Sequence, residues 1–117
     1  EKISKINQLI SDHEEMISNP ILEFISKRED LFLIGKNKIS NKNRAPTISF
    51  TSKKITSKKI SEILIKNKIA TRNDNFYAWR CLESLGIDLK DGVVRLSMTH
   101  YNSIEETNKL INVLEKI

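Results

Sequence analysis

The sequence predicts that residues 1–117 form a single α+β domain, in which a small mixed or antiparallel sheet of about four strands is covered by helices. Short apolar or alternating runs, bounded by turn residues, have the length and pattern of strands. Longer stretches carry apolar residues at the three- and four-residue spacing of amphipathic helices. A chain of this length can bury on the order of two-thirds of its unfolded surface, which is enough for one core.

The first elements are helical. Apolar residues at helical spacing predict a leading helix over residues 1–18. Asn19 then suits an N-cap and Pro20 the first position of a second helix, which runs to about Arg28. The sequence leaves open whether the two helices form one kinked rod. We therefore divide the domain into the leading helix and an α+β body at 19–117.

The body alternates strands and helices. Strands are expected at residues 31–34, 47–51, 69–71 and 93–98. Ser57 is expected to cap one helix, and residues 75–85 to form another that Gly86 ends. Ser103 and Glu106 have the spacing of a capping box at the start of the last helix, which runs to the end of the chain.

The charge is positive and unevenly spread. The chain has 20 basic and 15 acidic residues, a net charge of +5. Between Lys36 and Arg72 there are eleven basic residues and one acid, Glu62. One interpretation is a basic module that binds nucleic acid or another anion. The other is a solvated lysine-rich surface, and charge alone favours this second interpretation, so nucleic acid is not the expected partner.

Other residue types narrow the function. Cys81 is the single cysteine, which excludes an intramolecular disulfide and fits a reducing compartment, so we expect a cytoplasmic protein. Its mid-helix position predicts a buried, inert thiol. His13 is expected to be a satisfied core or interface histidine, and no His or Cys pair has metal-ligand spacing. No apolar run reaches the ~18 residues of a membrane span.

Arg95 is the residue best suited to ligand binding. It lies within an apolar strand, and the alternation of strand side chains directs it away from the face used by Val94 and Leu96. A guanidinium in such a place needs an anionic partner or an opening to solvent, and its fork matches a carboxylate. Spacing alone also permits an exposed strand arginine or a structural ion pair. His100 and Tyr101 follow, as proton-transfer candidates or as residues that pack the turn.

Several segments resemble one family. The segment from Gly92 to Glu106 resembles the C-terminal motif of the class V aminotransferase and cysteine desulfurase family, which consists of pyridoxal-phosphate (PLP) enzymes of fold type I. The matching positions are Arg95, Tyr101, Asn102, Ser103, Glu105 and Glu106. Residues 44–50 resemble the Arg-x-Pro-Thr-x-Ser-Phe strand of the desulfurase-like subgroup. Further similarities lie at Asn75–Ala78, Leu85-Gly86 and His13-Glu14.

The resemblance implies the small C-terminal domain of a PLP-dependent transferase, in which Arg95 binds the carboxylate of an amino-acid substrate. The PLP lysine and most cofactor contacts would belong to a large domain, so this chain alone is not expected to bind PLP or to catalyse. The implied partners are that large domain, the substrate and, in a homodimer, a second copy of the full enzyme. Candidate site-lining residues are Arg72, Asn75, Tyr77 and His100.

A further hypothesis is an interaction domain that dimerises through its first helix.

One departure from the family pattern concerns sulfur chemistry. Desulfurases carry a nucleophilic cysteine a few residues after an arginine that resembles Arg72, and Tyr77 stands near that place here. Cys81 is offset by about one helical turn, and Asp74 replaces the glycine of the usual Arg-x-Gly stretch. These departures argue against sulfur transfer through this domain, and they leave an aminotransferase, a lyase or an epimerase as alternatives.

Overall fold

The computed structural model describes residues 1–37 and 45–117. Four strands form one antiparallel sheet in the order β1-β2-β4-β3. The α+β prediction, with its sheet of about four strands, is confirmed. In chain order the elements are α1 (Lys2–Lys27), β1 (Leu31–Ile34), β2 (Thr47–Ser52), α2 (Ser57–Lys66), β3 (Arg72–Asp74), α3 (Trp79–Ser84), β4 (Val93–Ser97) and α4 (Ile104–Glu115).

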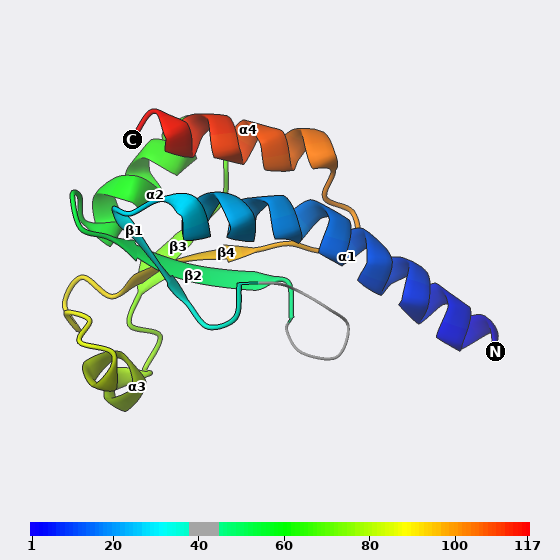
Figure 1. Cartoon of the computed structure of the whole chain (residues 1–117), viewed down its shortest axis with the longest axis horizontal. Coiled ribbons are helices and arrows are strands. Elements are labelled where there is room, and N and C mark those ends of the chain that lie inside the picture. The colour runs from blue at the N-terminus through cyan, green and yellow to red at the C-terminus, as the bar shows by residue number, and fades with distance from the viewer. Residues whose placement is uncertain (38–44) are drawn as a thin grey trace.

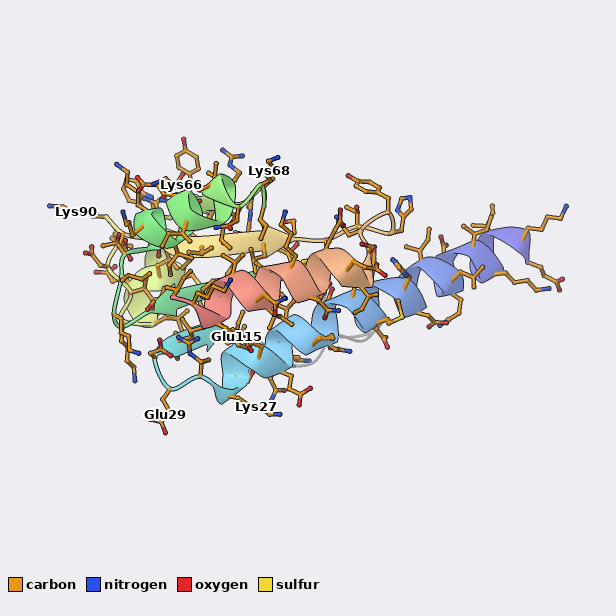
Figure 2. All side chains as sticks on the ribbon, turned by 90° about the horizontal axis from the view of Figure 1, so that it is seen from above. Lys27, Glu29, Lys66, Lys68, Lys90 and Glu115 are labelled. Carbon is orange, nitrogen blue, oxygen red and sulfur yellow. The ribbon has the colours of Figure 1, made fainter. Side chains whose placement is uncertain are left out.

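The helices are divided unequally between the two sides of the sheet. Figure 1 shows α1, α2 and α4 over one face, with the short α3 on the other side near one end. From above, α1 and α4 run side by side (Figure 2). The core fills the space between these three helices and the sheet, and its fully buried apolar residues are Ile17, Ile21, Leu22, Ile25, Ile48, Phe50, Ile60, Leu64 and Val94.

The two central strands show the alternation that separates the faces. Ile48 and Phe50 of β2 are fully buried, and Val94 of β4, the ladder partner of Phe50, is fully buried too. Because side chains alternate along a strand, the residues between them belong to the opposite face. We call that face, on the side away from α1, α2 and α4, the open face; it carries Ser49 of β2 and Arg95 of β4.

α1 answers the question that the sequence left open at Asn19. The helix continues from Lys2 to Lys27 with Pro20 inside it, so the expected boundary between residues 18 and 19 falls within one helix. A proline removes one hydrogen bond, to the carbonyl four residues earlier. That carbonyl belongs to Met16, a residue that is 51% exposed. Burial of Ile17 and its neighbours on both sides of the proline stabilises the continuous helix.

The first half of α1 carries apolar side chains that the described residues do not cover. Figure 1 shows this half projecting beyond the sheet. Exposure of these apolar side chains to water is unfavourable, because apolar surface is stabilised by burial. The exposed residues are Ile3, Ile6 and Leu9, at 75%, 55% and 70%.

The expected strand at 69–71 is wrong in position, because the observed strand lies three residues later, at Arg72–Asp74. Residues 69–71 connect α2 to the sheet, and β3 begins at Arg72. Lys68 adopts a left-handed φ of 61°, and the next backbone N–H donates to the carbonyl of Leu64 at 2.9 Å. These residues therefore close the end of α2 before the chain enters β3.

The start of α2 uses a different cap from the expected Ser57. Thr56 is the N-cap, and its hydroxyl accepts a hydrogen bond from the Lys59 N–H at 3.2 Å. Ser57 donates both its N–H and its hydroxyl to the carboxylate of Asp91, at 2.9 and 3.1 Å. Asp91 thus ties the positive end of α2 to the turn before β4.

Gly92, next to Asp91, is held where no side chain fits. Its φ is +64°, and a Cβ would lie 2.4 Å from the backbone of Asp74. Gly92→Ala should lower the free energy of unfolding by about 2–4 kcal/mol, because a left-handed conformation and an overpacked contact add. Urea denaturation measures the change. Gly86→Ala is the matched control: it has a φ of +72° but nothing within 4 Å, so it should cost only about 1–2 kcal/mol. Equal losses would contradict the packing explanation.

A carboxylate–guanidinium pair lies between α1 and β1 and is linked to α4. Arg28, at the end of α1, donates through Nε and Nη2 to both carboxylate oxygens of Asp30, at 2.7 and 2.6 Å. Arg28 also donates to the Leu114 carbonyl of α4 at 3.2 Å, and the Nζ of Lys54 lies 3.5 Å from Asp30. The hydrogen bond from Arg28 holds the pKa of Asp30 well below its usual range.

The depressed pKa predicts a pH dependence of stability. The pair should contribute fully above the unfolded-state pKa of Asp, about 3.9, and its contribution should be lost as pH falls through the lower folded-state value. Asp30→Asn should cost about 1–2 kcal/mol near neutral pH and flatten the loss of stability below about pH 4. Thermal unfolding from pH 2 to 7 measures both. Glu62→Gln, which removes an exposed pair with Lys59, should change little; an equal effect would contradict this assignment.

Candidate functional site

Arg95 lies in the middle of β4 on the open face of the sheet. Val94 and Leu96 on either side of it are buried against the helices, at 0% and 3% exposure. Arg95 itself is half-buried, as the alternation predicts. A partly desolvated guanidinium binds an anion more strongly than one in bulk water, because the local dielectric constant is lower.

The guanidinium of Arg95 contacts an aromatic ring and no acid. Its Cζ lies 4.0 Å from the ring centroid of Phe76. Within residues 1–37 and 45–117, no hydrogen bond or ion pair occupies the N–H groups of this guanidinium. A cation over a ring face is stabilised without using its hydrogen-bond donors. The donors therefore remain for a ligand, and the structural ion pair considered above is absent from this part of the chain.

A second arginine stands beside the first. Arg95 has Ser49 of β2 and Arg72 of β3 as its direct ladder partners. Directly opposite residues of antiparallel strands share a face, so both arginines start from the open face. Like charges so placed repel one another, and a bound anion would offset that repulsion. Arg72 is exposed, which leaves it accessible to such an anion.

Phe76 reaches Arg95 from a tight turn, where a helix from residue 75 was expected. α3 spans only Trp79–Ser84. Residues 75–78 form a turn instead, in which the Ala78 N–H donates to the Asn75 carbonyl at 3.0 Å. Phe76 and Tyr77 have φ values of 51° and 59°, and two positive central φ values are the pattern of a type I′ turn. The helix prediction failed because helical spacing does not report this backbone conformation.

Asn75 holds the turn with its side chain. Its Oδ1 accepts from the Tyr77 N–H at 3.0 Å, and its Nδ2 donates to the Leu89 carbonyl at 3.4 Å. Type I′ turns favour Gly and Asn at their central positions, and each bulky residue there costs about 1–2 kcal/mol. Phe76 and Tyr77 are thus held against a local preference, and such strain is concentrated at functional sites.

The structure groups some of the candidate site residues and separates another. Arg72 is the ladder partner of Arg95, and the turn with Asn75 and Tyr77 follows directly after β3. Tyr77 is 91% exposed. His100 lies beyond the opposite end of β4, because β3 and β4 are antiparallel, and it is exposed. The ring of His100 meets the ring of Tyr101 edge-on, with their centroids 5.5 Å apart.

His13 ties α1 to the loop after β4. Its Nε2 lies 2.6 Å from the carbonyl of Asn102, and the histidine is half-buried. This satisfied position is the one expected for His13. One turn further along α1, the Ile17 carbonyl accepts from the Thr107 hydroxyl at 2.8 Å. The two bonds fix α4 and its preceding loop against α1.

Three residues of the C-terminal motif form hydrogen bonds at the start of α4: Asn102, Ser103 and Glu106. The Asn102 Oδ1 accepts from the Thr99 N–H at 2.9 Å, and its Nδ2 donates to Glu106 at 2.9 Å. Ser103 and Glu106 form the predicted capping box at the start of α4. The hydrogen bonds from Asn102 and from the Ser103 backbone lower the pKa of Glu106. These residues set the end of β4 rather than facing the open side of the sheet.

Cys81 and the lysines give no sign of covalent chemistry. Cys81 is exposed on α3, so the expectation of a buried thiol was wrong, because α3 is short and mostly solvent-facing. The lysines outside residues 38–44 are exposed, as is Arg80. The described residues contain no cluster of three or more His, Cys, Asp or Glu that could hold a metal. In the same part of the chain, no helix is long and apolar enough to cross a membrane.

Sequence reasoning did not single out Phe76. The resemblance included it within Asn75–Ala78, but nothing in the spacing indicated that its ring folds back to Arg95. The one local indication is Asn75, since an asparagine before two non-helical residues can close a turn through its side chain. Arg44, the first residue of the other similar segment, lies outside the described residues.

Known proteins resemble this chain in sequence and in fold. The sequence profile described as Aminotransferase class-V matches residues 3–110. The aminotransferase-like protein FGM3 of Gibberella zeae is 30% identical over 110 residues, which cover 92% of this chain and 27% of that protein. A cysteine desulfurase of Thermococcus onnurineus superposes with a TM-score of 0.80 at 26% identity, over 93% of this chain and 26% of its own.

A more distant structure shares the fold. The cysteine desulfurase CsdA of Escherichia coli gives a TM-score of 0.73 at 17% identity, over 91% of this chain and 24% of that one. The chain thus spans about a quarter of the length of the proteins it matches. Both the profile match, which covers most of the residues, and the shared fold lead to the same conclusion: this chain belongs to the aminotransferase class-V family.

Proposed function

We propose that this chain is the C-terminal, substrate-carboxylate-binding domain of a PLP-dependent, class V aminotransferase or cysteine desulfurase-like enzyme that acts on an amino acid. The observation that supports this proposal is the half-buried guanidinium of Arg95, which has an aromatic contact and no acidic partner in the described part of the chain. Relatives about four times as long supply the context, because the chain covers 27% and 26% of two of them.

Arg95 would hold the substrate by its carboxylate. A guanidinium presents parallel N–H groups that match the two oxygens of a carboxylate, and such paired bonds fix orientation as well as affinity. Gripping the carboxylate places the Cα of the amino acid at a defined point, which lowers the entropy that must be lost before reaction. Arg72, its exposed ladder partner, adds positive potential to the same face.

The cofactor would be held by the rest of the enzyme. The family is PLP-dependent, and PLP supplies an electron sink for reactions at the Cα of amino acids. The described residues do not fit its attachment, because their lysines are all exposed and none lies in an enclosed setting. In this proposal the chain therefore binds and orients substrate, and it takes no covalent part in the reaction.

The uncovered half of α1 supports a partner domain. Ile3, Ile6 and Leu9 present an apolar stripe at 55–75% exposure. Burial of such surface stabilises by about 25 cal/mol per Å², so a neighbouring domain of the same cytoplasmic enzyme would gain by covering it. A second copy of the full enzyme, in a homodimer, could complete the enclosure of the site.

Tyr77 bears on the type of reaction. The resemblance puts it near the place of the desulfurase nucleophile, and the residue is 91% exposed. A thiolate is needed to take sulfur from a substrate, and Cys81 lies on α3, beyond the turn. The proposal therefore favours transamination, elimination or epimerisation over sulfur transfer through this domain.

No specific observation favours the alternative of nucleic-acid binding. Figure 2 shows Lys66 and Lys68 on one side of the molecule and Lys27 on another, near Glu29. Within the basic middle of the chain, Lys54 pairs with Asp30 and Lys59 with Glu62. A phosphate-tracking surface needs cations gathered on one face.

Arg95→Ala in the full-length enzyme should weaken amino-acid binding at least about 30-fold, because a charge-assisted paired hydrogen bond is lost. PLP binding should be unchanged. Spectral titration of the PLP-loaded enzyme with L-amino acids measures the first effect, and PLP content the second. Arg80→Ala, an exposed arginine on α3, is the control and should bind like wild type. Wild-type affinity in the Arg95 variant would remove the proposed role.

The α1 stripe gives a second prediction. With Cys81 replaced by serine, Ile6→Cys should react with a maleimide at least roughly tenfold faster in the 117-residue chain than in the full-length enzyme, since a domain that covers α1 shields the thiol. Labelling followed by mass spectrometry gives the rates. Asn112→Cys, on the exposed side of α4, should react equally in both. Equal rates for Ile6→Cys would show that no domain covers this stripe.

A further inference from the structure

We infer that Phe76 is a positioning residue for substrate binding: its ring holds the guanidinium of Arg95 in place while the N–H donors stay available for the carboxylate. This inference rests on the proposed function of Arg95. The ring centroid lies 4.0 Å from Cζ of Arg95, and no other described residue contacts this guanidinium by hydrogen bond or ion pair.

Arg28 shows that a guanidinium beside an aromatic ring can bind a carboxylate. Arg28 also lies over a ring, with its Cζ 5.7 Å from the centroid of Phe24. Its Nε and Nη2 donate to both oxygens of Asp30 at 2.7 and 2.6 Å. A guanidinium beside a ring thus grips a carboxylate in paired geometry. Arg95 has the ring, at closer range, and lacks the carboxylate.

The ring is fixed by its backbone. Phe76 sits in a turn that Asn75 closes through bonds to Tyr77 and Leu89, and its φ of 51° is one that few bulky residues adopt. A turn held in this way sets the direction of the side chain it carries. Glycine would relieve the strain but would leave Arg95 without a neighbour, which accounts for an aromatic residue at this position.

The ring should raise the affinity for the carboxylate because it restricts the rotamers of the Arg95 side chain before binding. A free arginine side chain samples many rotamers, and binding a carboxylate must select one of them. A guanidinium already held over a ring has lost that freedom before the ligand arrives, so less is lost on binding. The ring also contributes attraction of its own to the cation.

The test uses the PLP-loaded full-length enzyme and the twenty L-amino acids as probes. The tightest-binding member is compared with its carboxamide, which lacks the charge that Arg95 recognises. Phe76→Leu keeps apolar bulk without the ring, and we expect about 3–30-fold weaker binding of the amino acid and less than about twofold change for the carboxamide. Phe76→Tyr keeps the ring and should restore wild-type affinity. Phe32→Leu is the control, an exposed phenylalanine on β1 without contact to Arg95.

A merely structural role is separated by a double mutant. In the Arg95→Ala background, Phe76→Leu should cause no additional loss, because the two side chains act as one unit. A Phe76→Leu enzyme with wild-type affinity, alongside an impaired Arg95→Ala enzyme, would overturn the inference and leave the proposed function standing. Equal losses for amino acid and carboxamide would also overturn it. If Arg95→Ala is without effect, or if wild type binds no amino acid, the proposed function fails and this inference with it.

Discussion

The structure depends on a sheet that is packed by its main helices on one face only. Along β4, Val94 and Leu96 enter the core between sheet and helices, and the two-residue period of a strand then forces Arg95 to the other side. Burial of the first two therefore fixes the third, since a shift of one residue would bring the guanidinium into the core, at a cost no neighbouring acid could offset. The position of Arg95 on the open face is therefore a consequence of packing.

The two arginines that lie over aromatic rings differ in what their N–H groups contact. Arg28 is closed by Asp30 and by a carbonyl of α4, and so joins α1, β1 and α4 into one unit. Arg95 has a ring beneath it and open donors. For Arg28, the chain itself supplies the carboxylate that the guanidinium binds. For Arg95, under the proposed function, a ligand would supply it. Strain in the 75–78 turn is the local cost of placing a ring beside Arg95. At the opposite end of β4, the hydrogen bonds of Asn102 and His13 hold the chain in place.

Much of the fold could be predicted from local patterns, and the errors have definite causes. The α+β class, the strand at 93–97 and the capping box at Ser103 follow from periodicity and from residue types with strong local preferences. The sequence left open whether the first helix breaks at Asn19, and the helix continues because tertiary burial on both sides of the proline outweighs one lost hydrogen bond. The expected helix from residue 75 was wrong because spacing cannot detect left-handed residues, and the expected burial of Cys81 was wrong because α3 is short and mostly solvent-facing. Arg95 could be singled out, since an arginine within an apolar run is conspicuous.

The sequence by itself determined the family, through motifs spread over most of the chain, and it determined which face of its strand Arg95 occupies, because alternation is a property of the extended backbone. Only the tertiary structure decided what that guanidinium meets. The contact of Phe76 with Arg95 requires a turn whose geometry depends on Asn75 reaching Leu89, and a ladder that brings β3 beside β4. Interactions between residues distant in the chain are absent from local periodicity, so the ring beneath the arginine became visible only when the strands were paired.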